Sequence, residues 1–307
     1  MSAVAGVTSH SSLAAVTSRH ARRRGLVRRV PIRAGAATMG KNQHGTEIVE
    51  LSADDGACAT VYPFGACCTS WTPYKGGRDV LYCRPDAKFD KSKPISGGIP
   101  HCFPQFGPGK MQQHGFARNL DWAVTKTDGG KSPCVEMTLT DNDYTREMWP
   151  FSFKAVHTIT LMPGGQLEAK LSVTNTDSKP FDFTASFHTY LSLAAGIEEA
   201  RVSGLTGSKV SDRLANTEGT QSGDVAFTQA IDSVYFGAGP SLTLHAGADQ
   251  NVKIDASGGW VDAVVWNPWT DMESCYKEFV CVENAVLGTP AVAQPGATWT
   301  ATSVFSA

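Results

Sequence analysis

The sequence predicts an all-β protein, a large antiparallel β-sandwich. Short segments in which apolar and polar residues alternate follow one another from residue 47 onward, with little sustained 3.6-residue periodicity. The 30 Gly and 16 Pro residues supply the turns that many short strands require. Because each strand must bury one face, so many strands in 307 residues imply two packed layers.

Four segments in the middle of the chain are predicted as consecutive strands of an antiparallel meander. The connections at residues 162–165 and 175–180 are rich in Gly, Pro, Asn and Asp, which form tight turns. The four predicted strands are residues 134–140, 153–161, 167–174 and 181–193.

Five more predicted strands follow toward the C-terminus, again separated by Gly and Pro. They are residues 242–244, 251–255, 261–266, 279–282 and 299–305. No repeat of fixed period and no low-complexity linker occurs after residue 46. We therefore expect one domain over residues 47–307, preceded by a short linker at residues 36–46.

Residues 1–35 have the composition of an organelle transit peptide. They are rich in Ser, Thr and Ala and then in Arg, and the first acidic residue of the chain is Glu47. Their longest apolar run, residues 13–16, is too short for a secretory signal. We expect import into the chloroplast stroma. The mitochondrion is the alternative destination, and a disordered basic tail that binds an anionic surface is the alternative role.

The seven arginines of residues 1–35 offset the negative net charge of the rest of the chain. The whole chain has a formal net charge of −2, and the remainder carries 20 basic and 29 acidic side chains, a net charge of −9. Such a body repels polyanions at long range, so we expect no nucleic-acid partner. A phosphorylated ligand would need a local cationic pocket. No apolar stretch approaches the roughly 18 residues of a membrane-spanning helix, so no membrane partner is expected.

Eight cysteines are too sparse for a disulfide scaffold, and no C-x-x-C pair is present. The spacing therefore argues against a zinc site and against a thioredoxin-type motif, and we expect no metal. Free thiols in a reducing compartment are the default. Cys275 and Cys281 are the candidate pair for a regulatory disulfide, which a stromal thiol-redox partner would reduce.

Residues 94–119 form a candidate binding loop. Four Pro and five Gly in this segment predict irregular backbone, yet it also carries aromatic, imidazole and guanidinium groups, His114 and Arg118 among them. Functional side chains concentrate on such loops when a rigid sheet supports them. A structural loop with its own packed aromatic residues is the alternative.

A histidine lies on a polar strand face. Alternation in residues 181–191 places His188 on the same face as Thr184, Ser186 and Tyr190. These polar neighbours indicate a wet, concave surface. A structural histidine with satisfied hydrogen bonds is the alternative.

Two carboxylates are ambiguous by themselves. Glu283 follows the apolar run 279–282, so it is either a solvated strand end or a base whose pKa is raised by burial. The sequence around Asp232 likewise does not distinguish a carboxylate on the protein surface from one in a functional site.

Six short motifs occur in the order in which one known superfamily carries them. The set resembles the aldose 1-epimerase (mutarotase) superfamily over roughly residues 47–305. It is most similar to the hexose-6-phosphate branch, glucose-6-phosphate 1-epimerase, which includes plant proteins labelled apospory-associated protein C. The motifs are Gly-Gly-Ile-Pro at 97–100, Phe-Pro-Gln-Phe-Gly at 103–107, Gln-His-Gly-Phe-Ala-Arg-Asn at 113–119, Phe-His-Thr-Tyr at 187–190, Val-Trp-Asn-Pro-Trp at 265–269 and Phe-Val-Cys-Val-Glu at 279–283.

The resemblance implies a β-supersandwich with its site on a concave face, and a reaction that needs no cofactor. Glu283 would be the general base that takes the proton of the C1 hydroxyl, and His188 the general acid that protonates the ring oxygen. The ring opens, rotation about C1–C2 presents the other aldehyde face, and reclosure yields the other anomer.

The resemblance also implies the residues that bind the substrate, a small sugar phosphate. His114 would polarise the ring oxygen or the C1 region, and Asp232 would hold sugar hydroxyls. Arg118 would face the 6-phosphate, because its planar fork donates two hydrogen bonds at once. Gln113, in the same motif as His114, is expected to bind substrate too.

Two departures from the branch remove positive charge. The branch often has Arg where this chain has Ser96, before Gly-Gly-Ile-Pro, and again where it has Ser233. A free-aldose 1-epimerase is therefore the nearest alternative function. Candidates to compensate are Lys93, Arg78, Arg84 and the backbone amides of residues 97–98.

An alternative from another class is a non-catalytic carbohydrate-binding sandwich. Such a protein would stack sugars on a platform of aromatic rings and would not need Glu283 and His188 together. The candidate platform residues are Trp71, Trp149, Trp266 and Trp269.

Overall fold

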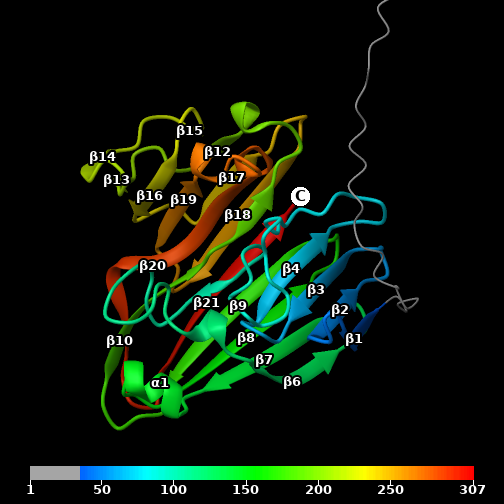
Figure 1. Ribbon diagram of the computed structural model, residues 1–307, viewed down its shortest axis with the longest axis vertical. Coiled ribbons are helices and arrows are strands. Elements are labelled where there is room, and N and C mark those ends of the chain that lie inside the picture. The colour runs from blue at the N-terminus through cyan, green and yellow to red at the C-terminus, as the bar shows by residue number, and fades with distance from the viewer. Residues whose placement is uncertain (1–34) are drawn as a thin grey trace, which may run out of the picture. The chain divides into compact units, whose positions relative to one another are not determined.

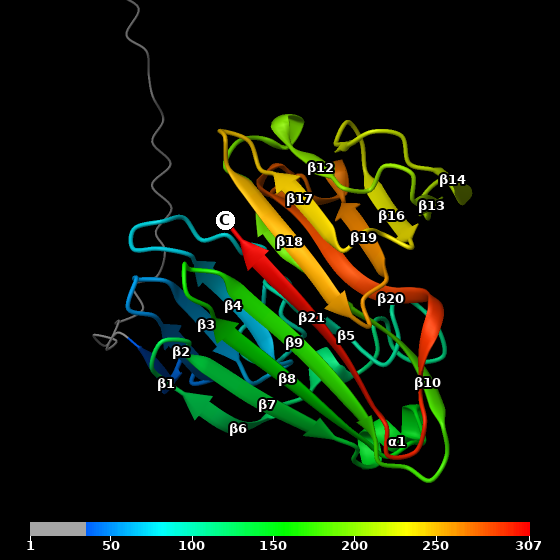
Figure 2. The same ribbon diagram turned by 180° about the vertical axis from the view of Figure 1, so that it is seen from behind.

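The computed structural model describes residues 35–307 and contains three antiparallel sheets, which confirms the predicted all-β sandwich. The predicted transit peptide lies outside the described residues, except for Gly35. Figures 1 and 2 show that the largest sheet forms one layer and that the other two sheets lie against the same face of it.

Each sheet has a simple strand order. The nine-stranded sheet runs β15 (Val225–Ala226), β12 (Arg201–Ser203), β17 (Ser241–His245), β18 (Asn251–Gly258), β21 (Thr298–Ser306), β9 (Leu167–Asn175), β8 (Phe153–Leu161), β7 (Cys134–Thr140) and β6 (Ala123–Asp128). The eight-stranded sheet runs β14 (Thr217–Thr220), β13 (Lys209–Asp212), β16 (Ile231–Phe236), β19 (Asp262–Asn267), β20 (Phe279–Ala293), β10 (Phe181–Phe187) and β5 (His101–Cys102), and β11 (Tyr190–Ser192) also pairs with β20. The four-stranded sheet runs β1 (Ala36–Lys41), β2 (Glu47–Ser52), β3 (Cys58–Tyr62) and β4 (Cys67–Thr72).

Helices are short and lie in the connections. The α-helix α1 (Asp143–Met148) is capped by Asn142, whose side chain accepts a hydrogen bond from the Thr145 amide. The 3₁₀ turns are η1 (Ala117–Asn119), η2 (Ile197–Glu199), η3 (Trp269–Met272) and η4 (Tyr276–Glu278). Within residues 35–307, no helix has the length and apolar character needed to cross a membrane.

The main hydrophobic core lies between the layers. It joins buried side chains from all three sheets, such as Val61 of β3, Ile159 of β8 and Phe187 of β10. In β8 and β9 every second residue is buried, as the alternating pattern of the sequence predicts.

Two of the three strand pairings in the predicted four-stranded meander are correct. Strands β7, β8 and β9 do pair consecutively, but β10 lies in the other sheet, between β20 and β5. The buried amide of Asn175 donates hydrogen bonds of 2.8 Å to the carbonyls of Lys179 and Ala293. These bonds stabilise a turn that carries the chain between layers, and β21 takes the place beside β9 instead.

The predicted strand at residues 279–282 is much longer in the structure. Strand β20 extends over 15 residues, and its first eight residues are all buried. Glu283 is therefore in the strand interior and not at a solvated end. The apolar run ends at Glu283 in sequence, but pairing with β10 and β19 continues beyond it.

Residues 36–46, expected to be a linker, contain β1. This strand pairs with β2 in continuous register, from Ala36 opposite Ser52 to Lys41 opposite Glu47. Its burial pattern is mostly exposed, as an edge strand allows, so the sequence shows little alternation there.

Two fully buried histidines lie in the core. Nε2 of His101 is 3.0 Å from Nδ1 of His157, which is also 3.0 Å from the carbonyl oxygen of Ala66. The His101 ring stacks on Trp122. Burial lowers the pKa of both imidazoles, that of His157 to about 3, so both are neutral in the folded protein at pH 7.

We expect stability to fall as the pH drops below about 6.5, the pKa of imidazole in an unfolded chain. The unfolded chain then binds protons that these folded imidazoles do not bind. The fall in Tm between pH 7 and pH 5 should be smaller in His157→Gln than in the wild type, and unchanged in His44→Gln at the exposed surface. Equal falls in all three proteins would contradict this account.

Candidate active site

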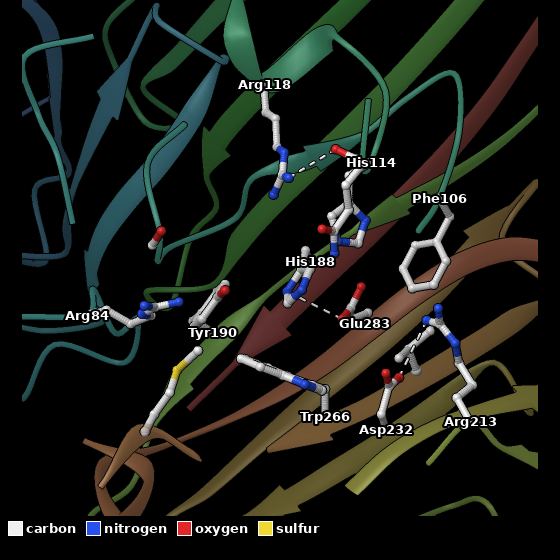
Figure 3. Close-up of a pocket in the computed structure, with 14 residues that line it drawn as sticks. Arg84, Phe106, His114, Arg118, His188, Tyr190, Arg213, Asp232, Trp266 and Glu283 are labelled. Carbon is white, nitrogen blue, oxygen red and sulfur yellow. Dashed lines mark hydrogen bonds and ion pairs between the residues drawn. The ribbon is translucent and has the colours of Figure 1, made fainter. Parts of the chain in front are cut away.

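A pocket of about 330 Å³ lies over Glu283 and brings all the predicted site residues together (Figure 3). It is lined by the predicted Glu283, His188, His114, Arg118, Asp232 and Gln113. Arg84, Ser96, Phe106, Tyr190, Arg213 and Trp266 also line it.

Glu283 points into the pocket from the first half of β20 and is 1% exposed. Its Oε2 accepts a hydrogen bond of 2.7 Å from the hydroxyl of Ser186 on β10. Its Oε1 faces Nδ1 of His188 at 3.3 Å, and neither atom has a hydrogen-bond partner among residues 35–307. Burial raises the pKa of the carboxyl to about 8, against the smaller opposing effect of the Ser186 hydrogen bond.

His188 lies in the gap between β10 and β11, so the predicted strand at residues 181–193 is interrupted at the site. Its amide donates to the carbonyl of Pro100 in the candidate loop at 3.0 Å, instead of to a neighbouring strand. The imidazole stacks on Tyr190 and meets Trp266 edge-on. Burial, followed by the charges of nearby groups, lowers the pKa of His188 well below its ordinary value, so this imidazole is neutral at pH 7.

His114 presents a fixed tautomer to the pocket. Its backbone has a φ of 66°, a left-handed conformation that is uncommon outside glycine. The amide of Gly107 donates to its Nδ1 at 3.1 Å, so the proton of the neutral ring is on Nε2, which lies 3.3 Å from the side-chain amide of Gln113. Burial lowers the pKa of His114 to about 3, which keeps this ring an uncharged donor.

Three arginines surround the acid–base pair. Arg118 donates to the carbonyl of Gln113 at 3.0 Å, and its buried Nε has no hydrogen-bond partner among residues 35–307. Arg84 forms a two-point ion pair with Asp86, with contacts of 2.9 and 2.6 Å. Arg118 and Arg84 approach His188 from different sides in Figure 3.

The third arginine, Arg213, was missed by the sequence reasoning. It follows β13, and its guanidinium is 3.5 Å from Asp232 and 5.5 Å from the ring centre of Phe106. Burial raises the pKa of Asp232, against the charge of Arg213. No motif marks Arg213 in the sequence, because only the pairing of β13 with β16 brings it beside Asp232.

Comparison with known proteins identifies the family. Residues 47–306 match the family described as aldose 1-epimerase. The chain is 33% identical over 293 residues to a protein from Cenchrus ciliaris, covering 88% of each chain. The chain belongs to the aldose 1-epimerase family. That relative carries the name "Putative glucose-6-phosphate 1-epimerase", as does an Escherichia coli K12 protein that is 30% identical over 72% of this chain and 77% of its own.

Solved structures of similar proteins share the fold. A "putative mutarotase" from Salmonella typhimurium aligns with a TM-score of 0.78 and 24% identity, covering 87% of this chain and 92% of its own. Galactose 1-epimerase from Lactobacillus acidophilus NCFM aligns with a TM-score of 0.62 and 13% identity, covering 88% of this chain and 97% of its own. The family match and the curated relatives show that the chain is an isomerase of the aldose 1-epimerase type.

The aromatic platform expected of a non-catalytic binding protein is not formed. Of the four candidate tryptophans, only Trp266 lines the pocket. Trp71 and Trp149 are buried in the main core, and Trp269 packs against Tyr276.

Arg84 is the only one of the three charged side chains proposed as compensation that lines this pocket. Lys93 is exposed outside it, and Arg78 donates to the carbonyl and hydroxyl of Ser192 instead. Ser96 lines the pocket, whereas Ser233 is buried outside it.

All eight cysteines are free thiols. Cys275 and Cys281, the candidate redox pair, lie in one apolar cluster without a bond between them. Burial raises the pKa of both thiols, which disfavours the thiolate needed for disulfide exchange. The structure gives no support to a thiol-redox partner. In the described part of the chain, no cluster of three or more His, Cys, Asp or Glu side chains could hold a metal ion.

Glu283→Gln is expected to stabilise the folded enzyme at alkaline pH. The folded carboxyl, with a pKa of about 8, keeps its proton above the unfolded value of 4.5, and the associated stability is lost as the pH rises toward 8. The neutral amide of the Glu283→Gln variant does not ionise, so its contribution to the free energy of unfolding does not change with pH. The Tm difference between variant and wild type should grow by about 5 °C or more from pH 5 to pH 9. Exposed Glu147→Gln is the control, and a difference that does not depend on pH would contradict the raised pKa.

Proposed function

We propose that this enzyme interconverts the α and β anomers of a hexose 6-phosphate, glucose 6-phosphate, by acid–base ring opening and reclosure. The observation that carries the proposal is the pair of Glu283 and His188, which face each other at 3.3 Å in a pocket that Arg118 and Arg84 also line. A carboxyl and an imidazole can exchange protons with two oxygens of one sugar, and guanidinium groups suit a phosphate.

The reaction begins with one proton on the pair, placed on His188, and with Glu283 ionised. Glu283 takes the proton of the C1 hydroxyl and His188 gives one to the ring oxygen, as the bond between C1 and the ring oxygen breaks. The product is an open-chain aldehyde. After rotation about C1–C2, His188 regains its proton from that oxygen and Glu283 returns one to O1. The enzyme ends as it began, and no cofactor is consumed.

His114 supports this chemistry as a donor. Its Nδ1 is occupied by the Gly107 amide, so Nε2 is the nitrogen that carries the proton. We assign that N–H to the ring oxygen or the C1 oxygen of the sugar. Because the ring stays neutral, it stabilises developing negative charge without competing for the proton of the pair.

A bound 6-phosphate would also favour transfer of the proton from Glu283 to His188, the arrangement that the reaction requires. Burial first, and then nearby groups that include the charged Arg118 and Arg84, lower the pKa of His188, while burial raises that of Glu283, so both shifts favour the proton on Glu283. A phosphate dianion bound by Arg118 and Arg84 neutralises two of these charges. The pKa of His188 then rises, and the proton moves toward the residue that must donate it.

Glu283→Gln and His188→Asn should each reduce turnover of glucose 6-phosphate at least about 100-fold, because each removes one proton transfer while nearly preserving shape. Anomer exchange is measured by polarimetry or NMR above the spontaneous rate, and circular dichroism checks the fold. Glu147→Gln is the control. A variant of either residue that retains more than about a tenth of wild-type turnover would contradict its role.

The wild type should have a higher kcat/KM for glucose 6-phosphate than for glucose, and Arg118→Ala should reduce this preference about 10- to 150-fold, as expected for a charge-assisted contact. Arg84→Ala should reduce it too. Lys93→Ala, outside the pocket, is the matched control. If the wild-type ratio of the two kcat/KM values is near one, or if Arg118→Ala leaves that ratio unchanged, the enzyme is a free-aldose 1-epimerase. This is the alternative that the serine at position 96 favours.

We also propose that the enzyme works in the chloroplast stroma. The Arg-rich composition of residues 1–35, without acidic side chains, supports this location.

A further inference from the structure

Two buried polar side chains lie beneath the pocket, side by side on neighbouring strands. Ser186 of β10 and Cys102 of β5 are direct cross-strand partners in the antiparallel pair. Side chains of such partners share one face of a sheet. Both residues are 0% exposed, and neither lines the pocket, so neither is placed to touch a sugar.

Each member of this pair contacts a different functional group. The Ser186 hydroxyl donates to Oε2 of Glu283 at 2.7 Å. The Cys102 sulfur is 3.1 Å from Nδ1 of His114. Burial raises the pKa of this thiol well above its ordinary value, so the sulfur keeps its proton and donates it to the unprotonated Nδ1.

The geometry points to Ser186 and Cys102 as a positioning pair, which orients the Glu283 carboxyl and the His114 imidazole toward the sugar from beneath. This inference rests on the proposed function, because it assigns both groups to ring opening. With Oε2 held by Ser186, Oε1 is the oxygen left to face His188 and the substrate. With Nδ1 held by Cys102 and Gly107, only Nε2–H of His114 can donate.

Ser186 also affects where the proton of the acid–base pair resides. Its hydrogen bond stabilises the charged form of Glu283, and thus opposes the effect of burial. Removing the hydroxyl leaves all other nearby groups in place. Besides Cys102, the ionisable groups that face Glu283 from the surrounding elements are His188, Asp232, Arg213, Arg118, Tyr190 and Cys281.

The first test compares Ser186→Ala with Ser303→Ala. Ser303 is an equally buried serine that donates to Asn284, the neighbour of Glu283 on the opposite face of β20, at 2.6 Å. Ser186→Ala should raise the pKa of Glu283 by about one unit and reduce kcat about tenfold or more, with a smaller change in KM. Ser303→Ala should leave both values unchanged.

The pKa of Glu283 is measured by the carboxyl band in infrared spectra at a series of pH values, and that band is assigned by its loss in Glu283→Gln. The alkaline limb of the kcat/KM profile should move with it. An unchanged titration and pH profile in Ser186→Ala, or equal shifts in Ser303→Ala, would overturn the role of Ser186.

The second test compares two changes of Cys102. Cys102→Ser retains a second donor beside Nδ1 of His114, whereas Cys102→Ala leaves the Gly107 amide as the remaining donor to that nitrogen. We expect Cys102→Ala to lower kcat about tenfold and Cys102→Ser to restore most of that loss. Equal activities of the two variants would show that Cys102 only fills space, and would overturn its positioning role.

The infrared titration separates this inference from the proposed reaction, because it does not depend on turnover. A wild type that anomerises no sugar contradicts the proposed function. An active wild type whose Glu283 titration is insensitive to Ser186→Ala contradicts the positioning role alone.

Discussion

Burial of the Glu283 carboxyl in the interior of β20 is the constraint on which the rest of the site depends. An ionised carboxylate removed from water costs several kcal/mol unless it is hydrogen-bonded or paired. The structure meets this cost in part with the Ser186 hydroxyl and in part by keeping the proton on Glu283, whose pKa rises to about 8. A carboxyl with such a pKa can gain and lose a proton near neutral pH, as the proposed proton transfer to and from a sugar requires.

The two-layer fold supplies the rigid frame, and the site lies where the chain departs from regular strand geometry. His188 occupies the gap between β10 and β11, where its amide bonds to the loop carbonyl of Pro100. His114 adopts a left-handed backbone conformation on the same loop. Strand β20 pairs with both β10 and β11 across this gap. The imidazoles are thus held over one buried carboxyl, although they come from segments far apart in the chain.

The charges of the protein repel an anionic ligand at long range and attract it within the pocket. The body of the chain is acidic, yet Arg84, Arg118 and Arg213 line one pocket. Salt screens the repulsion of the acidic surface beyond about 8 Å, whereas contacts inside a cleft are screened much less. Arg213 is paired with Asp232, while Arg118 has an unpartnered Nε among the described residues. Under the proposed function, the Arg213 side of the pocket would hold sugar hydroxyls and the Arg118 side would hold the phosphate.

The sequence by itself determined the fold class, most strands of the two larger sheets, and the identity of Glu283, His188, His114, Arg118, Asp232 and Gln113 as pocket residues. Period-two alternation and turn residues are local properties, and the six motifs are read directly along the chain. Only the tertiary structure decided that β10 leaves the meander, that β20 continues past Glu283, and that Arg213 and Arg84 join the site. It also decided that burial raises the pKa of Glu283 and lowers that of His188. The physical reason is that these features depend on the pairing of strands that are distant in the chain and on the depth at which the paired strands bury a charged side chain. No local pattern of residues encodes the pairing or the depth of burial.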